Sequence, residues 1–82
     1  MNEYYVSVFV ESFIPKYSSK HYYFLVKSES EERCRLTIDR IIKNWKLAYY
    51  EDEVLVVVGE AKYHEKEIEY LREKGELKII GK

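Results

Sequence analysis

The sequence of 82 residues predicts one α+β domain, residues 1–82, because strand-like and helix-like segments alternate along the chain. Hydrophobic residues make up 46% of the chain and aromatic residues 16%, which is too apolar for a disordered protein. The expected elements are strands at 4–14 and 21–27, a helix that ends near Trp45, strands at 47–50 and 54–58, a helix at 61–74 and a strand at 77–80. Their order is ββαββαβ.

The segment 54–58 is the most apolar of these strands. It reads Val-Leu-Val-Val-Val, and Gly59 follows it. A strand with no polar position on either face is expected in the middle of a sheet that is covered on both sides. From residue 21 onward, the order βαββαβ is that of a split βαβ, or ferredoxin-like, sandwich, in which the strands at 21–27 and 54–58 are central. The strand at 4–14 is then an extra N-terminal strand of that sheet.

The first two strands are expected to form an antiparallel hairpin. Alternation separates Val6, Val8 and Val10 on one face of the first strand from Tyr5 and Phe9 on the other. In the second strand it separates Tyr22, Phe24 and Val26 from His21, Tyr23 and Leu25. Pro15 ends the first strand, and the polar connector at 16–20 is short enough for a hairpin.

Each predicted helix has an apolar side and a recognisable end. Ser28 and Glu31 form a capping-box pattern at the start of the first helix. The apolar residues of this helix recur at helical spacing: Cys34, Ile38, Ile41, Ile42 and Trp45. The second helix has a thinner apolar side, made by Ala61, His64, Ile68 and Leu71, and ends at Gly75. Together the two helices are expected to cover one face of the sheet.

The other face is expected to be free of helices and to form an apolar surface. The residues assigned to it are Tyr5, Phe9, Tyr23, Leu25, Leu55 and Val57. Fully burying such a side chain is worth roughly 1.5–3 kcal/mol, so this face is predicted to bind a protein partner, most simply a second copy of the chain. One alternative is stacking on RNA bases, although the aromatic signature of RNA-binding sheets is absent. Another is a second layer formed by the extra strand or a terminus.

Basic residues gather on the first helix, away from its apolar stripe. Residues 31–46 hold five basic and three acidic residues, and the connector at 16–20 adds two lysines. Arginine-rich helix faces suit contact with phosphate groups. The predicted RNA-binding residues are Arg33, Arg35, Arg40, Lys43, Lys46, Lys16 and Lys20. The alternative is a solvated helix face held by pairs four residues apart.

The sequence lacks the common patterns of catalytic and metal-binding residues. It has no nucleophile elbow, Gly-rich phosphate loop or HExxH helix. Its only aspartates, Asp39 and Asp52, fall on a helix surface and in a turn. His21, Cys34 and His64 lack the spacing of zinc ligands. We therefore expect no enzymatic activity, no metal and no cofactor.

The composition limits the kinds of partner that the chain can bind and indicates the kind of organism it comes from. A net charge of −1 argues against bulk binding to a polyanion, so any nucleic-acid contact must use a local patch. The chain is rich in Glu and Lys and has no Gln, which predicts a thermophilic, archaeal source. A lone cysteine and the lack of a signal-peptide pattern or a membrane span predict a soluble cytoplasmic protein without a membrane partner.

Two functional hypotheses follow. The first is a non-catalytic accessory component of an archaeal ribonucleoprotein, for example the ribosome, which contacts RNA phosphates through the first helix and a protein neighbour through the apolar sheet face. The second is a self-associating, homodimeric regulatory or structural protein with no role in RNA binding. The fold alone does not choose between them, because this architecture serves many functions.

Overall fold

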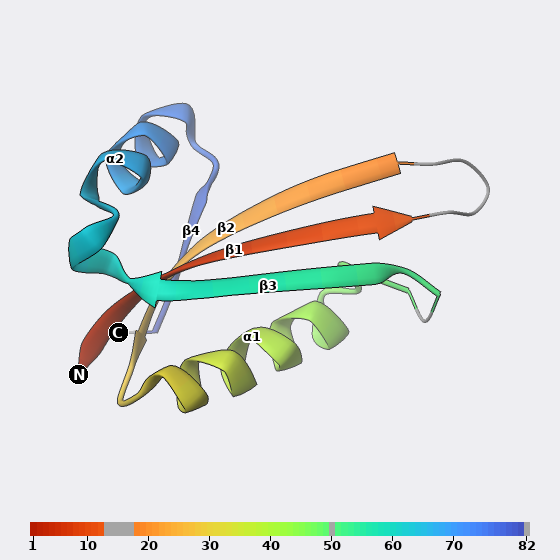
Figure 1. Cartoon of the computed structure of the whole chain (residues 1–82), viewed down its shortest axis with the longest axis horizontal. Helices are drawn as coiled ribbons and strands as arrows, with labels where there is room; N and C mark the ends of the chain where they lie inside the picture. Colours follow the sequence, from red (N-terminus) through yellow and green to blue (C-terminus); the bar gives the residue numbers. More distant parts are fainter. Residues whose placement is uncertain (13–17, 50, 82) are drawn as a thin grey trace.

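One mixed four-stranded sheet with a helix against each face makes up the described part of the chain, residues 1–12, 18–49 and 51–81 of a computed structural model (Figure 1). The elements are β1 (Asn2–Ser12), β2 (Ser18–Ser28), α1 (Glu31–Asn44), β3 (Glu53–Glu60), the short 3-10 turn η1 (Ala61–Tyr63), α2 (Glu65–Lys74) and β4 (Leu77–Ile80). The predicted α+β class is therefore confirmed.

The sheet is built around the β1–β2 hairpin. These two long strands pair antiparallel over their whole length, with Val6 opposite Phe24, which confirms the predicted pairing. The strand order is β3-β1-β2-β4; β3 pairs antiparallel with β1, and β4 pairs parallel with β2. Because β1 lies between β2 and β3, the unit β2-α1-β3 is a split βαβ crossing.

The main core lies between the sheet and α1. The alternation predicted for the hairpin is correct, because its even-numbered side chains face this helix. The buried residues here are Tyr4, Val6, Val8, Val10, Phe24, Val26, Cys34, Ile38 and Ile41. Ile42 is half-buried against them, and Trp45 lies half-exposed at the helix end with its ring 6.1 Å from that of Phe24. The amphipathic stripe of α1 is thus largely as the sequence predicts.

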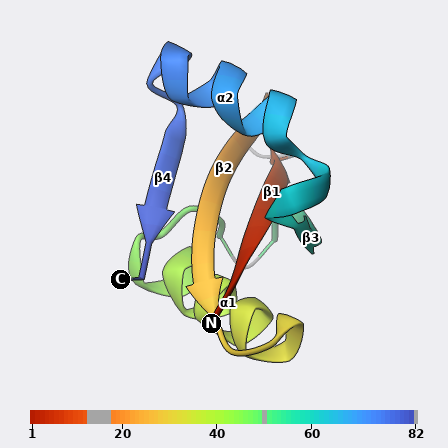
Figure 2. The ribbon, with the colours of Figure 1, turned by 90° about the vertical axis from the view of Figure 1, so that its left-hand side faces the viewer.

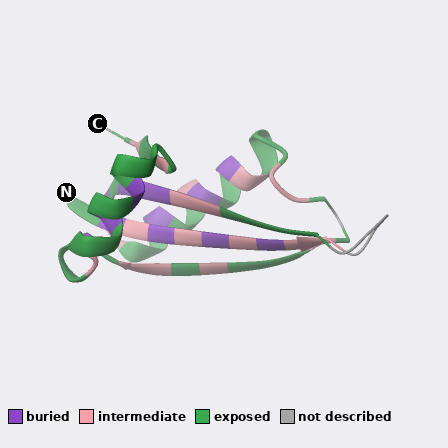
Figure 3. Cartoon of the chain, turned by 90° about the horizontal axis from the view of Figure 1, so that it is seen from above, coloured by how far each residue is buried: buried purple, intermediate pink, exposed green. Residues whose placement is uncertain are grey.

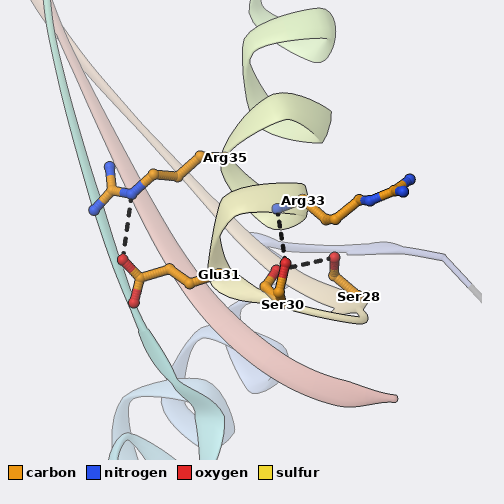
Figure 4. A network of polar contacts seen from close by, with 5 residues as sticks. All are labelled: Ser28, Ser30, Glu31, Arg33 and Arg35. Atoms are coloured by element: carbon orange, nitrogen blue, oxygen red, sulfur yellow. Dashed lines mark hydrogen bonds and ion pairs between the residues drawn. The ribbon is translucent and has the colours of Figure 1, made fainter.

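The start of α1 differs from the prediction. The N-cap is Ser30, whose hydroxyl oxygen accepts a hydrogen bond from the Arg33 backbone N–H at 3.2 Å (Figure 4). Ser28 is still in β2 and buried, and its hydroxyl donates to the Ser30 carbonyl oxygen at 3.2 Å. The predicted capping box from Ser28 to Glu31 is therefore wrong, because β2 continues through Ser28 and the helix begins only at Glu31.

The second helix packs on the opposite face of the sheet, so that the sheet lies between two helices (Figure 2). Three residues of the predicted apolar side, Ala61, Ile68 and Leu71, are buried, whereas the fourth, His64, is only half-buried. Leu25 of β2 is buried against Ala61 and Ile68. Gly75 closes α2 in the left-handed conformation, with φ of 73°, which confirms its predicted role. The helix has only ten residues and covers one end of this face (Figure 3).

Three predictions about the sheet are therefore wrong. The segment 54–58 belongs to the edge strand β3, whereas β1, the predicted extra strand, is central. Residues 47–49 form no strand, which leaves four strands in the described residues, and Tyr50 lies outside them. The order of elements along the chain is thus ββαβαβ rather than the predicted ββαββαβ. In the sheet, the β1–β2 hairpin and not the segment 54–58 occupies the centre. The predicted strand end at Pro15 also lies outside the described residues.

Candidate functional site

The face of the sheet opposite α1 is only partly covered by α2. Beyond that helix, toward the start of β3, the strands are bare (Figure 3). We call the bare region the uncovered patch and define it by Phe9, His21, Tyr23, Leu55 and Val57. Leu55 and Val57 are 60% and 54% exposed, His21 is exposed, and Phe9 and Tyr23 are half-buried. The predicted helix-free face is therefore reduced to this patch.

The patch is continuous across three strands. In the register of the sheet, Phe9 on β1 lies between Leu55 on β3 and His21 on β2. The Phe9 and His21 ring centroids are 4.6 Å apart, and the His21 ring stacks on Tyr23 at 5.9 Å. Leu55 and Val57 thus line the outer edge of the patch, Phe9 and Ser7 of β1 lie in its middle, and the rings of His21 and Tyr23 lie on β2. Such a surface can pack against apolar side chains of another chain.

Two residues predicted for this interface lie instead beneath or beside α2. Leu25 is only 6% exposed, because Ala61 and Ile68 pack over it, so its assignment to the interface is wrong. Tyr5 is half-buried at the border of the helix, and burial raises the pKa of its hydroxyl. The sequence could not separate these residues from the exposed ones, because alternation assigns a face and not a position along it.

A hollow of about 370 Å³ separates the uncovered patch from α2. It is lined by Tyr5, Tyr23, Lys66, Glu67, Tyr70 and Leu71. At its rim the Tyr5 ring lies 5.0 Å from the ring of His64, and His64 Nδ1 lies 2.8 Å from a Glu67 carboxylate oxygen. This hydrogen bond holds the pKa of the Glu67 carboxyl below its usual range. The hollow is therefore an apolar recess with charged groups only along its helix side.

The predicted RNA-binding residues of α1 do not converge. Arg33 and Arg35 extend to opposite sides of the helix, and Arg35 pairs with Glu31 at 3.4 Å (Figure 4). Arg40 and Lys43 are exposed. Lys46 follows the helix with φ of 54°, so it occupies a left-handed position that ends the helix. Spacing alone could not show these separate directions.

The other two predicted RNA-binding residues, Lys16 and Lys20, come from the hairpin connector and not from α1. Lys20 is exposed on β2, in register with Val10 on the face that α1 covers. Lys16 lies outside the described residues. The described basic residues thus form a scattered set around α1 rather than one focused pocket.

The histidine and cysteine residues considered as metal ligands are also separated. Cys34 of α1 is fully buried on the side of the helix that faces the sheet, where burial raises the pKa of its thiol, whereas His21 lies on the other face of the sheet. Within residues 1–12, 18–49 and 51–81, no group of three His, Cys, Asp or Glu side chains could hold a metal ion. No helix in the same ranges is long and apolar enough to cross a membrane.

Comparison with family models, curated proteins and solved structures finds no match for this chain. A functional assignment must therefore come from its own surfaces. The uncovered patch and the adjoining edge strand β3 form one continuous apolar surface. Sequence reasoning assigned Phe9, Tyr23, Leu55 and Val57 to this face; it placed His21 there too without including it in the interface, and it missed the open edge. The signal for His21 was its place in the alternation of β2.

Proposed function

We propose that this chain is a non-catalytic interaction protein that binds another polypeptide over the uncovered patch. The observation that carries the proposal is the exposure of Leu55 and Val57 at 60% and 54%, with Leu55 in register with Phe9 of β1. Burying large apolar side chains contributes about 25 cal/mol for each Å² removed from water. A contiguous patch of such side chains is typical of a protein-binding surface. The partner is a second copy of the chain or a different protein.

Replacing both Leu55 and Val57 with Lys should abolish this association. Two charges within an apolar contact would have to be desolvated without partners, so we expect binding to weaken by at least about 100-fold. The measurement uses the tagged chain as bait in native lysate, with and without ribonuclease, followed by sedimentation of the purified bait to detect a dimer. Folding should persist, because both side chains already face solvent.

The matched control replaces Leu36 on α1 and Ile79 on β4 with Lys, since both are apolar and comparably exposed at 57% and 56%. It should bind as the wild type does. Association that is equally lost in the control, or equally kept in the Leu55 and Val57 variant, would contradict the proposal. Partners that disappear on ribonuclease treatment would favour the next candidate.

A second candidate function is contact with RNA phosphates by α1, as an accessory component of a ribonucleoprotein. One observation favours it: Arg33, Arg40 and Lys43 are exposed, and they form no ion pair with any residue in the described ranges. Free cations on one helix can bind backbone phosphates, and such contacts need no pocket. The exposed Leu36 among them gives this surface a small apolar component.

Replacing Arg33, Arg40 and Lys43 together with Ala should flatten the salt dependence of RNA binding. Each lost phosphate contact lowers the slope of log affinity against log salt by about 0.7 for single-stranded RNA, so three contacts lower it by about 2. The free energy of unfolding should change by only a few tenths of a kcal/mol for each residue. Fluorescence anisotropy with labelled RNA at several salt concentrations measures the slope.

The control for this variant replaces Lys62, Lys66 and Lys74 of the α2 region, which removes the same charge. It should leave the slope unchanged. Equal slopes for the wild type and the α1 variant would show that the helix is simply solvated.

A further inference from the structure

The outer edge of β3 is an unprotected sheet edge. The strand has eight residues, and its pairing with β1 runs without a bulge from Val10 opposite Val54 to Tyr4 opposite Glu60. Five consecutive apolar residues, 54–58, occupy its centre. No strand pairs with its other side among the described residues. Protein sheets usually protect such edges with charges, proline, bulges or short strands, because open backbone groups can pair with another chain.

The opposite edge of the same sheet has that protection. β4 has only four residues, and Lys78 lies within it and is exposed. A short strand with a central lysine is a poor template for pairing. The sheet thus presents one protected edge and one open edge, and the open edge borders the uncovered patch through Leu55 and Val57.

The charged residues of β3 and of the turn before it are all acidic. Between residues 51 and 60, every charged residue is acidic: Glu51, Asp52, Glu53 and Glu60. Glu11 of β1 lies in register with Glu53 and adds to the acidic end. Lys62 approaches Glu60 at 3.9 Å from beyond the strand, and both side chains are well exposed. The open edge is therefore an apolar centre between two acidic ends.

This charge pattern disfavours a second copy as the strand that pairs with β3. An antiparallel pair of two β3 strands matches all five apolar residues only when Val56 meets itself across a two-fold axis. In that register Asp52, the residue just before β3, comes opposite Glu60 of the other copy, so acidic residues adjoin at both ends of the pair. Directly opposed like charges destabilise a strand pair. Moving the register by two residues avoids this contact but reduces the apolar pairs from five to three.

We infer that β3 binds an extended segment of a different protein, with an apolar centre and Lys or Arg at both ends, which adds a fifth strand to the sheet. Backbone hydrogen bonds along β3 supply the pairing, as in other complexes formed by strand addition. The apolar side chains of the segment extend the row formed by Leu55 and Val57, while its basic ends meet the acidic ends of β3. This inference rests on the proposed function and specifies its partner.

The test uses two labelled peptides with blocked ends and the same centre. The basic peptide is Lys-Lys-Val-Thr-Val-Thr-Val-Lys-Lys, and in the acidic peptide Glu replaces each Lys. Fluorescence anisotropy with the full chain should show at least tenfold tighter binding of the basic peptide at about 0.02 M salt. The preference should shrink at about 0.5 M salt, where exposed charges are screened. Amide hydrogen exchange should slow in residues 53–60 and not in β4.

A charge-reversal variant makes the result specific. Replacing Glu53 and Glu60 with Lys should invert the preference, so that the acidic peptide binds more tightly. The control variant, Glu73→Lys with Glu76→Lys, makes the same charge change near β4 and should keep the preference for the basic peptide. Both pairs of residues are exposed, so the fold should tolerate either change.

The inference would be overturned by equal binding of the two peptides, by a preference that the Glu53 and Glu60 variant does not invert, or by exchange protection outside β3. Absence of peptide binding would also overturn it. If an association that depends on Leu55 and Val57 then persists, the proposed function stands with another partner. If that association is absent too, the proposed function fails as well.

Discussion

Replacing Phe24 with Ala should lower the free energy of unfolding by about 3–5 kcal/mol. Phe24 is fully buried on the central strand β2, and it packs in the core beneath α1, with the ring of Trp45 6.1 Å away. The substitution removes a whole ring from a close-packed interior and leaves a cavity that its neighbours can fill only in part. A domain of this length typically has about 4–12 kcal/mol of stability, so the loss is a large fraction of the total.

Urea denaturation followed by circular dichroism measures the change. A Trp45→Phe variant, which keeps an aromatic ring at the half-exposed helix end, should lose much less stability. A loss below about 1 kcal/mol in the Phe24 variant would show that the core does not centre on β2. A variant that fails to fold at all would agree with the expected size of the effect.

The alternation of side chains in the β1–β2 hairpin largely predicts which residues face each layer of the fold. In β1 and β2 the even-numbered apolar residues face α1, and the odd-numbered residues face the other way, as period-2 patterning predicts. The apolar stripe of α1 and the role of Gly75 in ending α2 could also be predicted from the sequence, because each depends on local helix geometry. Local patterns therefore predicted which side chains share a face.

The position of β3 could not be predicted in this way. Its run of five apolar residues carries no alternation, so the pattern cannot show which face is covered. In the structure, Val56 and Val58 pack against the core beneath α1, whereas Leu55 and Val57 remain exposed. A strand that is buried on both faces and an edge strand with an exposed apolar face have the same hydrophobic pattern in the sequence.

The placement of α2 was missed for a related reason. The sequence predicted two helices on one face, whereas the split crossing places α1 on one face and the connection to β4 places α2 on the other. The apolar side of α2 is short, and it can cover only the end of the sheet near Tyr5 and Leu25. That shortness was visible in the sequence, and it is the physical reason why the uncovered patch exists.

The sequence could predict an exposed apolar face of the sheet, but it could not predict that β3 forms an open edge of the sheet. Strand order depends on contacts between residues far apart in the chain, which composition and spacing do not encode. The acidic residues on both sides of 54–58 were visible from the start, but their meaning depends on β3 being an open edge. At a central strand the same residues would only mark two turns.

Replacing Val8 with Ala should cost about 2–3 kcal/mol of unfolding free energy, whereas replacing Val57 with Ala should cost at most about 1 kcal/mol. The two substitutions remove the same atoms, so their difference reports how differently the two positions are buried and packed. Val8 is fully buried in the central strand β1, while Val57 is 54% exposed on the edge strand β3. Urea denaturation at low protein concentration keeps association from adding to the stability. Equal losses would restore β3 as a central strand and remove the open edge on which both interaction proposals over the sheet depend.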